Sequence, residues 1–244
     1  MKNKLLHFII VFSLCSFSFI GDENPEELTV SVEDFAKDHY QQLKDHSLLY
    51  KPFKLGIKGY YKLLNDRKIQ NLDYITIVDF TKPSNDKRMY IIDTKEWKIV
   101  HRSLVAHGMK TGELFAKDFS NEDNSHQSSL GFYLTGEVYN GKHDKSLKLD
   151  GYEYSNSHAR ERGVVIHAAD YVSSDYIKSN GRLGRSYGCP AIPHEGYDDV
   201  IDKIKGGSLF FIYYPDKYYM KKSKFVNTQE NFKLTCEGKV VKSS

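Results

Sequence analysis

Apolar residues recur first at helical and then at strand spacing along this chain of 244 residues. Ser31 before Glu33 and Asp34 is typical of a helix start, because a serine side chain caps free backbone N–H groups and acidic side chains favour the first turn. Pro52 suits the first position of a second helix. Both starts are followed by apolar positions one helical turn apart, at Val32, Phe35, Ala36, Tyr40 and Leu43 and at Phe53, Ile57, Tyr60 and Leu64.

Beyond residue 73 the pattern changes to that of strands. Residues 74–80 alternate and are rich in β-branched side chains. Further strands are expected at 88–93, 97–105, 131–138, 163–167 and 208–214, with a turn at Thr94-Lys95 and a short helix ending at Ile204 before two glycines. Two helices followed by many strands predict an α+β, predominantly β domain rather than a βαβ fold.

The first 20 residues are typical of a signal peptide. Lys2 and Lys4 precede an apolar run over residues 5–20, and Ser16-Phe17-Ser18 is a small-x-small cleavage site. The alternative is an uncleaved membrane anchor, but the run of about 16 residues is shorter than the ~20 that a membrane-spanning helix needs. The sequence therefore predicts an exported protein of the periplasm or cell envelope, with no stable membrane insertion after cleavage.

Charge and cysteine content argue against two classes of protein, nucleic-acid-binding proteins and proteins built on a disulfide framework. The formal charge of +3 falls to +1 without Lys2 and Lys4, which argues against a nucleic-acid-binding protein. The last 28 residues hold seven lysines and two glutamates, which indicates a basic, solvated tail, with contact to an anionic wall polymer as the alternative. After cleavage only Cys189 and Cys236 remain, too few for a disulfide framework, and Cys236 is expected to have no catalytic part.

Cys189 and His167 form the candidate catalytic pair. Cys189 lies in a glycine-rich segment, and His167 ends an apolar run 22 positions upstream. Cysteine attacks as the thiolate, and imidazole is the usual base that removes its proton. Gly188 lets the backbone approach a substrate carbonyl, and the N–H of Gly188 or Cys189 is a candidate donor to the oxyanion. The structural alternatives are a buried thiol and a core histidine.

The residues around this pair resemble the signature of L,D-transpeptidases of the YkuD type, which cross-link bacterial peptidoglycan. Ser186-Tyr187-Gly188-Cys189 after Ile166-His167 carries the resemblance. Further segments look like the murein L,D-transpeptidase branch, at 77–80, 105–108, 119–121, 128–131, 139–143, 149–151, 162–171 and 181–191. The chain differs from many members in having Tyr187 instead of His and Ala168 instead of Gly.

The resemblance implies a mixed β-sandwich or barrel-like catalytic domain over residues 73–215. A helical segment over 21–72 would precede it, and the basic tail over 216–244 would follow. It further implies that Cys189 attacks the carbonyl of the third residue in a donor stem tetrapeptide. His167 would be the general base, with its second nitrogen held by a backbone carbonyl near Ser186. An amine of a second stem would then accept the acyl group.

Six more residues are candidates around the pair. Gly188 and Ser186 are expected to shape the catalytic turn, although turn chemistry alone explains a serine there. Tyr187 would line the cleft and offer its N–H to the oxyanion, or simply pack. Arg162 and Arg185 match the carboxylates of the donor stem, with structural salt bridges as the alternative. His107 would face the cleft as a substrate contact or else be structural.

Several other functions compete with transpeptidation. Water as acceptor would make the protein an L,D-carboxypeptidase, and cleavage of existing cross-links at the same site is a further alternative. A papain-like protease would place its Cys before its His, the reverse of the order here. A non-catalytic wall-binding module would need no reactive thiol. A zinc site at Cys189, His167, Asp170 and His194 lacks the usual short spacings, and the resemblance implies no metal or other cofactor.

Overall fold

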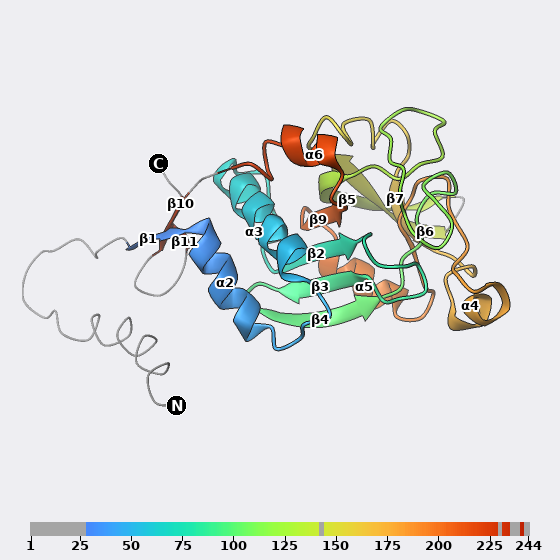
Figure 1. The fold of residues 1–244 in the computed structure, drawn as a ribbon, viewed down its shortest axis with the longest axis horizontal. Coiled ribbons are helices and arrows are strands. Elements are labelled where there is room, and N and C mark those ends of the chain that lie inside the picture. Colours follow the sequence, from blue (N-terminus) through green and yellow to red (C-terminus); the bar gives the residue numbers. More distant parts are fainter. Residues whose placement is uncertain (1–27, 142–143, 229–230, 235–239, 242–244) are drawn as a thin grey trace, which may run out of the picture.

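A mixed sheet of eight strands forms the centre of the molecule in this computed structural model, which describes residues 28–141, 144–228, 231–234 and 240–241 (Figure 1). The strands lie in the order β4-β3-β2-β9-β5-β6-β7-β8. Their bounds are β2 Tyr74–Asp79, β3 Met89–Asp93, β4 Lys98–Ser103, β5 Gly131–Gly141, β6 Asp144–Gly151, β7 Val165–Ala168, β8 Ala191–Ile192 and β9 Leu209–Tyr213. The predicted signal peptide and Cys236 lie outside the described residues.

The two edges of the sheet approach each other and make it barrel-like. Only the pairs β2–β9 and β7–β8 are parallel, and the other neighbours are antiparallel. The chain that leaves β4 forms a bridge from Ala106 to Ala191 of β8, at the opposite edge. The predicted fold, predominantly β with a mixed barrel-like sheet, is therefore confirmed.

The helices lie around this sheet. They are α2 Val32–Gln42, α3 Tyr50–Asn65, α4 Ser174–Asn180, α5 Tyr197–Ile204 and α6 Lys217–Lys222. The α3 helix contacts β2 and β9, α2 packs against α3, and α5 contacts β2 (Figure 1). A separate three-stranded sheet joins β1 Leu28–Ser31, β10 Asn231–Leu234 and β11 Val240–Val241. Among the described residues, no helix combines the length and apolar character that crossing a membrane requires.

The two predicted helix starts fare differently. The Ser31 side chain accepts a hydrogen bond from the Asp34 N–H at 3.1 Å, so its predicted capping role is confirmed. The second helix begins at Tyr50, so the prediction that Pro52 takes its first position is wrong. Pro52 still lies in the first turn, where a backbone N–H has no partner within the helix and its loss costs little.

Two glycines on α3 let that helix approach the sheet closely. A Cβ atom on Gly59 would lie 2.0 Å from the Phe132 ring, and one on Gly56 would lie 2.8 Å from Ile77. Phe132 itself stacks on Phe211 with ring centroids 4.0 Å apart. Since the side chains of α2, α3 and the strands belong to one hydrophobic core, the N-terminal helices are part of the same packed unit as the sheet.

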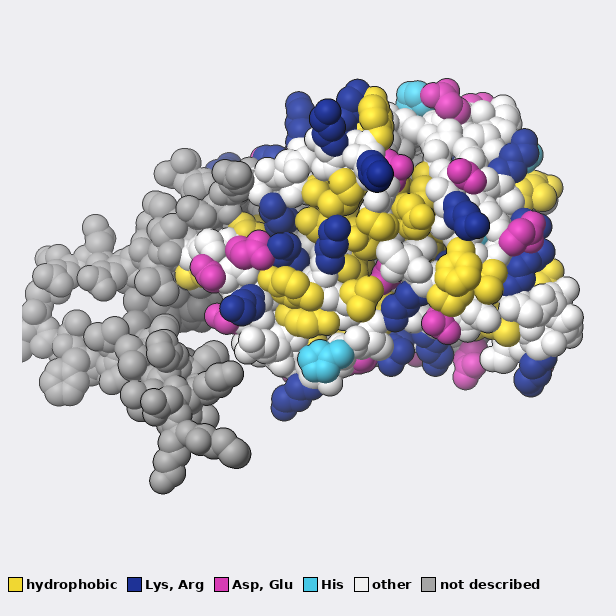
Figure 2. All heavy atoms as spheres, viewed as in Figure 1, with side chains coloured by type: hydrophobic (Ala, Val, Ile, Leu, Met, Phe, Trp, Pro, Cys, Tyr) yellow, Lys and Arg dark blue, Asp and Glu magenta, His cyan; other side chains and the backbone are white. Residues whose placement is uncertain are grey.

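The segment from α6 to Val226 packs on the domain, so the expectation of a solvated tail is wrong for these residues. Tyr219, Ser223, Phe225 and Val226 are buried, while the lysines between them are exposed. Figure 2 shows Lys and Arg side chains gathered along the upper edge of this face, where Figure 1 places α6. The basic composition therefore describes only the outer side of this segment.

A buried carboxylate fastens that segment. Glu153 accepts hydrogen bonds from the Tyr219 hydroxyl at 2.7 Å, from the Ser223 hydroxyl and from the Phe132 N–H at 3.1 Å. Burial raises the pKa of Glu153, although these three donors oppose the shift. The amino acid sequence shows a lysine-rich helix here, but not the partner that holds it.

Candidate active site

A tight turn between α4 and β8 presents the candidate nucleophile. The Ser186 hydroxyl donates to the Cys189 carbonyl at 2.6 Å and accepts from the Gly188 N–H at 3.0 Å. Gly188 has φ +126°, and a Cβ atom there would lie 2.8 Å from the Gln127 carbonyl oxygen. Ser186 thus closes the turn, and only glycine fits at position 188 without strain.

The same turn decides which backbone groups can stabilise an oxyanion. The Gly188 N–H is taken by the Ser186 hydroxyl, so the expectation that it might serve as the oxyanion donor is not supported. Within the described residues, the N–H groups of Tyr187 and Cys189 make no hydrogen bond. These two N–H groups are therefore the available donors next to the sulfur.

The Cys189 thiol lies between two backbone groups of the segment that leads into β7. Its Sγ donates to the Gly163 carbonyl at 3.6 Å and accepts from the Val165 N–H at 3.5 Å. Burial raises the pKa of this thiol, while the Val165 N–H and the nearby Arg162 cation lower it by less. The group is consequently a thiol at neutral pH, and it needs a base to become a nucleophile.

His167 is held in the tautomer that such a base requires. It is buried on β7, and its Nδ1 lies 2.9 Å from the Ala168 carbonyl oxygen. A carbonyl only accepts, so Nδ1 carries the proton, and in the neutral ring Nε2 is the nitrogen that can take up a second proton. The holding carbonyl thus belongs to Ala168 and not to the Ser186 region.

Strand register brings His167 and Cys189 to the same end of the sheet. His167 pairs with Ala191 in the parallel β7–β8 ladder, two residues beyond Cys189. Val165, whose N–H contacts the sulfur, lies two residues before His167, and alternate residues of a strand share a face. The register therefore places both candidate residues at the same end of the sheet, on or next to neighbouring strands.

Both candidate arginines form hydrogen bonds or ion pairs within the protein, in agreement with the structural alternative, and Arg162 also lines the pocket. The Arg162 guanidinium donates to the carbonyls of Ser120 and Gln127 and to the hydroxyls of Ser125 and Ser129, at 2.6–3.1 Å. Arg185 forms an ion pair with Glu113 at 2.6 Å. Arg162 fastens the loop over residues 120–129 beside the thiol, and Arg185 fastens the one before it.

His107 is a structural residue, so its predicted contact with substrate is corrected. It is 1 % exposed, its Nδ1 accepts from Arg88 at 2.7 Å, and its Nε2 donates to the Gly112 carbonyl at 3.1 Å. Burial, with the Arg88 cation next in size, lowers the pKa of His107 to about 3. Its carbonyl oxygen accepts from the Ser186 N–H at 3.0 Å, so this neutral histidine supports the catalytic turn from behind.

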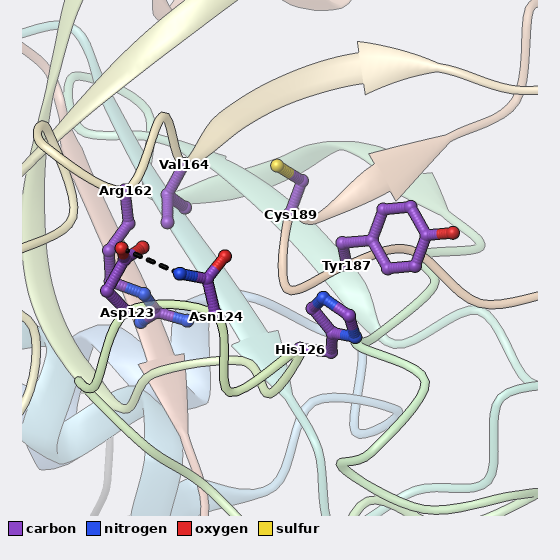
Figure 3. Close-up of a pocket in the computed structure, with 7 residues that line it drawn as sticks. All are labelled: Asp123, Asn124, His126, Arg162, Val164, Tyr187 and Cys189. Carbon is purple, nitrogen blue, oxygen red and sulfur yellow. Dashed lines mark hydrogen bonds between the residues drawn. The ribbon is translucent and has the colours of Figure 1, made fainter.

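Cys189 opens into a pocket of about 200 Å³. The residues that line it are Asp123, Asn124, His126, Arg162, Val164, Tyr187 and Cys189 (Figure 3). Tyr187 is 70 % exposed, and its ring centroid lies 4.6 Å from that of His126, so its predicted place in the cleft wall agrees with the structure.

The sequence analysis missed three pocket residues, Asp123, Asn124 and His126. They lie in a polar loop whose composition indicates a turn and nothing more. Asn124 and His126 have φ +54° and φ +56°, a strained region that is enriched at functional sites. Across the described ranges, no group of three or more His, Cys, Asp or Glu side chains is arranged to hold a metal ion.

Comparison with known proteins agrees with this geometry. The family model of the L,D-transpeptidase catalytic domain matches residues 44–213, more than half of the chain. The chain belongs to this family. The matched part of this L,D-transpeptidase domain begins inside the predicted helical segment, before α3, and ends with β9. No curated protein matches the chain.

Solved structures from several bacteria are similar to this L,D-transpeptidase domain at low sequence identity. An L,D-transpeptidase from Mycobacterium smegmatis is 9 % identical, with a TM-score of 0.38, and the match covers 58 % of this chain and 59 % of that one. The cell shape determining protein Pgp2 (K307A mutant) from Campylobacter jejuni is 15 % identical, with a TM-score of 0.34 and coverage of 66 % and 53 %. An L,D-transpeptidase from Stackebrandtia nassauensis is 12 % identical, with a TM-score of 0.35 and coverage of 84 % and 88 %.

Proposed function

We propose that this protein is a peptidoglycan L,D-transpeptidase that joins the third residues of two stem peptides through a thioester on Cys189. The observation that carries the proposal is a partly buried thiol that opens into a pocket, with a histidine of fixed tautomer at the same end of the sheet. A thiol with a raised pKa is a weak nucleophile, and an imidazole that holds its proton on Nδ1 can act through Nε2 as the missing base.

The first half of the proposed reaction forms the acyl-enzyme. Nε2 of His167 takes the thiol proton as Sγ of Cys189 attacks the carbonyl carbon of the third residue. The N–H groups of Tyr187 and Cys189 donate to the oxyanion. The C–N bond to the terminal D-alanine then breaks, and the amine leaves with the proton from His167. The energy of the cleaved peptide bond stays in the thioester, so no nucleotide is required.

The second half transfers the acyl group to a second stem. The side-chain amine of its third residue attacks the thioester carbon, His167 takes a proton from that nitrogen, and the C–S bond breaks. The proton returns to the sulfur, which restores the thiol. Water in place of the amine would give a tripeptide and an L,D-carboxypeptidase. The amine competes because a bound group gains several kcal/mol from proximity.

The proposed substrate agrees with export of the protein. The apolar segment over residues 5–20 behind two lysines is typical of a signal peptide. Processing and export would bring the domain to the periplasm or cell envelope, where stem peptides of peptidoglycan are its partners.

Defined muropeptides test the proposal. Tetrapeptide muropeptides should yield cross-linked dimers with release of D-alanine, and pentapeptides should not serve as donors. Mass spectrometry should detect the thioester on the wild-type protein, and Cys189→Ala should abolish both thioester and products. Tripeptides alone, with acceptor in excess, would identify a carboxypeptidase. No released D-alanine and no acyl-enzyme would contradict the enzyme assignment and favour a wall-binding module.

A further inference from the structure

The pocket next to Cys189 carries an oriented pair of polar side chains, Asp123 and Asn124, that the reaction described above does not use. The Asn124 Nδ2 donates to the Asp123 carboxylate at 2.9 Å. A carboxylate only accepts, so this contact fixes which end of the Asn124 amide is NH₂ and which is the carbonyl. The carbonyl oxygen is turned away from Asp123 and toward the side of the pocket where Cys189 lies (Figure 3).

The two residues offer negative charge and carbonyl and carboxylate acceptors, while one N–H of the Asn124 amide is taken by Asp123. Asp123 forms no ion pair with any residue in the described part of the chain. The Arg162 guanidinium next to it makes four hydrogen bonds that hold the loop. The free acceptors of Asp123 and Asn124 therefore suit a ligand group with several N–H donors and a positive charge.

We infer that Asp123 and Asn124 recognise the primary ammonium group on the side chain of the third stem residue. The inference rests on the proposed function, because joining two third residues requires a side-chain amine at that position. Two molecules can supply the amine. It belongs either to the donor stem, where it lies near the carbonyl under attack, or to the acceptor stem, where it becomes the nucleophile.

Two variants separate the contributions of shape and charge. Asn124→Gly removes the carbonyl acceptor and keeps φ +54° free of strain, because glycine adopts that region readily. Asp123→Asn removes the charge but keeps an oxygen that can accept from Asn124. Glu122→Gln is the matched control, because Glu122 is an exposed carboxylate on the same loop that does not line the pocket.

Three rates are measured for each protein. Acylation by a carbapenem, which lacks the stem side chain, reports on the thiol and its base alone, and Glu122→Gln should leave it unchanged. Acylation by tetrapeptides with a free or an N-acetylated side-chain amine reports on the donor. The ratio of cross-linked dimer to tripeptide reports on the acceptor. In Asn124→Gly and Asp123→Asn, either the preference for the free amine or this ratio should fall by about tenfold, as expected for loss of one charge-assisted hydrogen bond.

The outcomes separate this inference from the proposed function. If the preference for the free amine falls at the acylation step, the recognised amine belongs to the donor stem. If the ratio of cross-linked dimer to tripeptide falls, the amine belongs to the acceptor stem. Either result supports the inference. If both measures stay at the wild-type level while the wild-type protein forms thioester and dimer, the inference is wrong and the proposed function stands. If the wild-type protein forms neither thioester nor dimer, the proposed function is wrong, and calorimetry on Cys189→Ala then tests the inference. Tighter binding of the free-amine tetrapeptide than of its N-acetyl form supports the inference. Equal binding of the two peptides overturns it.

Discussion

At the residue scale, the chemistry of Cys189 depends on opposing effects on one thiol. Burial raises its pKa, and the Val165 N–H and Arg162 cation do not outweigh that effect. The thiol therefore stays protonated at neutral pH, and a base is needed to form the thiolate. We expect His167, whose Nδ1 is fixed on the Ala168 carbonyl, to be that base.

Replacing His167 by alanine should reveal the raised pKa directly. At neutral pH, acyl-enzyme formation should fall by about 10²–10⁴-fold, as for other general bases. Alkylation of Cys189 by iodoacetamide in His167→Ala should rise with pH, with a midpoint above that of a free cysteine, because the thiolate now forms only by direct ionisation. In the same protein unfolded in urea, alkylation of Cys189 should have the midpoint of a free cysteine. Acylation at the wild-type rate would exclude His167 as the base.

At the scale of elements, α3 and α6 are fixed to the barrel in different ways. The α3 helix approaches the sheet through glycines, with no side chain between the Gly59 backbone and the Phe132 ring. The α6 helix is fastened by the Glu153 carboxylate. The contact of α3 depends on close packing, so an added side-chain atom should disturb it. The contact of α6 depends on hydrogen bonds to a carboxylate, so the charge on that carboxylate should affect it.

Gly59→Ala should destabilise the protein although alanine is the better helix former. The added methyl would lie 2.0 Å from a ring carbon of Phe132, and overpacking of a core costs about 1–3 kcal/mol. The gain in helix propensity is only about 1 kcal/mol. Urea unfolding should show a net loss in the free energy of unfolding. Lys51→Ala, at an exposed position in the first turn of the same helix, should change that free energy by less than about 0.5 kcal/mol. Unchanged stability of Gly59→Ala would contradict the close packing.

Glu153→Gln should change the dependence of stability on pH. The pKa of Glu153 is raised in the folded state, so the folded state binds more protons than the unfolded state between the ordinary and the raised pKa. The stability contributed by this group is therefore present at low pH and is lost as pH rises from about 4.5. Relative to Glu153→Gln, the wild-type protein should become progressively less stable over that range in urea unfolding.

Glu153→Ala serves as the contrast to that variant. It leaves the Tyr219 hydroxyl and the Phe132 N–H without their acceptor, which should cost about 2–4 kcal/mol at all pH values. If Glu153→Gln and the wild-type protein show parallel stability curves from pH 4 to 8, the carboxyl is not titrating in the folded state as described.

At the scale of the whole molecule, the active site is assembled from segments far apart in the chain. Residues 107–112, 120–129, 162–168 and 186–189 meet at one end of the barrel. Cys236 lies beyond residues 44–213, which match the family model. We therefore expect Cys236→Ser to keep full activity and Cys189 to remain titratable by thiol reagents after oxidation. A native disulfide between Cys189 and Cys236 would contradict this and would place the nucleophile under redox control.

The sequence by itself determined the features that depend on local spacing. The strand period predicted the predominantly β fold, the Ser31 cap predicted the start of α2, and the glycine-rich segment indicated Cys189 as the candidate nucleophile. Such features depend on residues that are close in the sequence, because helix caps, turns and the alternation of strands extend over a few positions. The pairing of His167 with Cys189 needed the family resemblance as well, since 22 residues separate them.

Only the tertiary structure decided what each polar side chain contacts. Arg162, Arg185 and His107 look like substrate ligands in the sequence, yet their hydrogen bonds go to loops folded against them. Asp123 and Asn124 look like an ordinary turn, yet they line the pocket of the nucleophile. A long polar side chain binds whatever partner the fold brings within about 3 Å, and that partner comes from a distant part of the chain, so residue type and local spacing do not specify it.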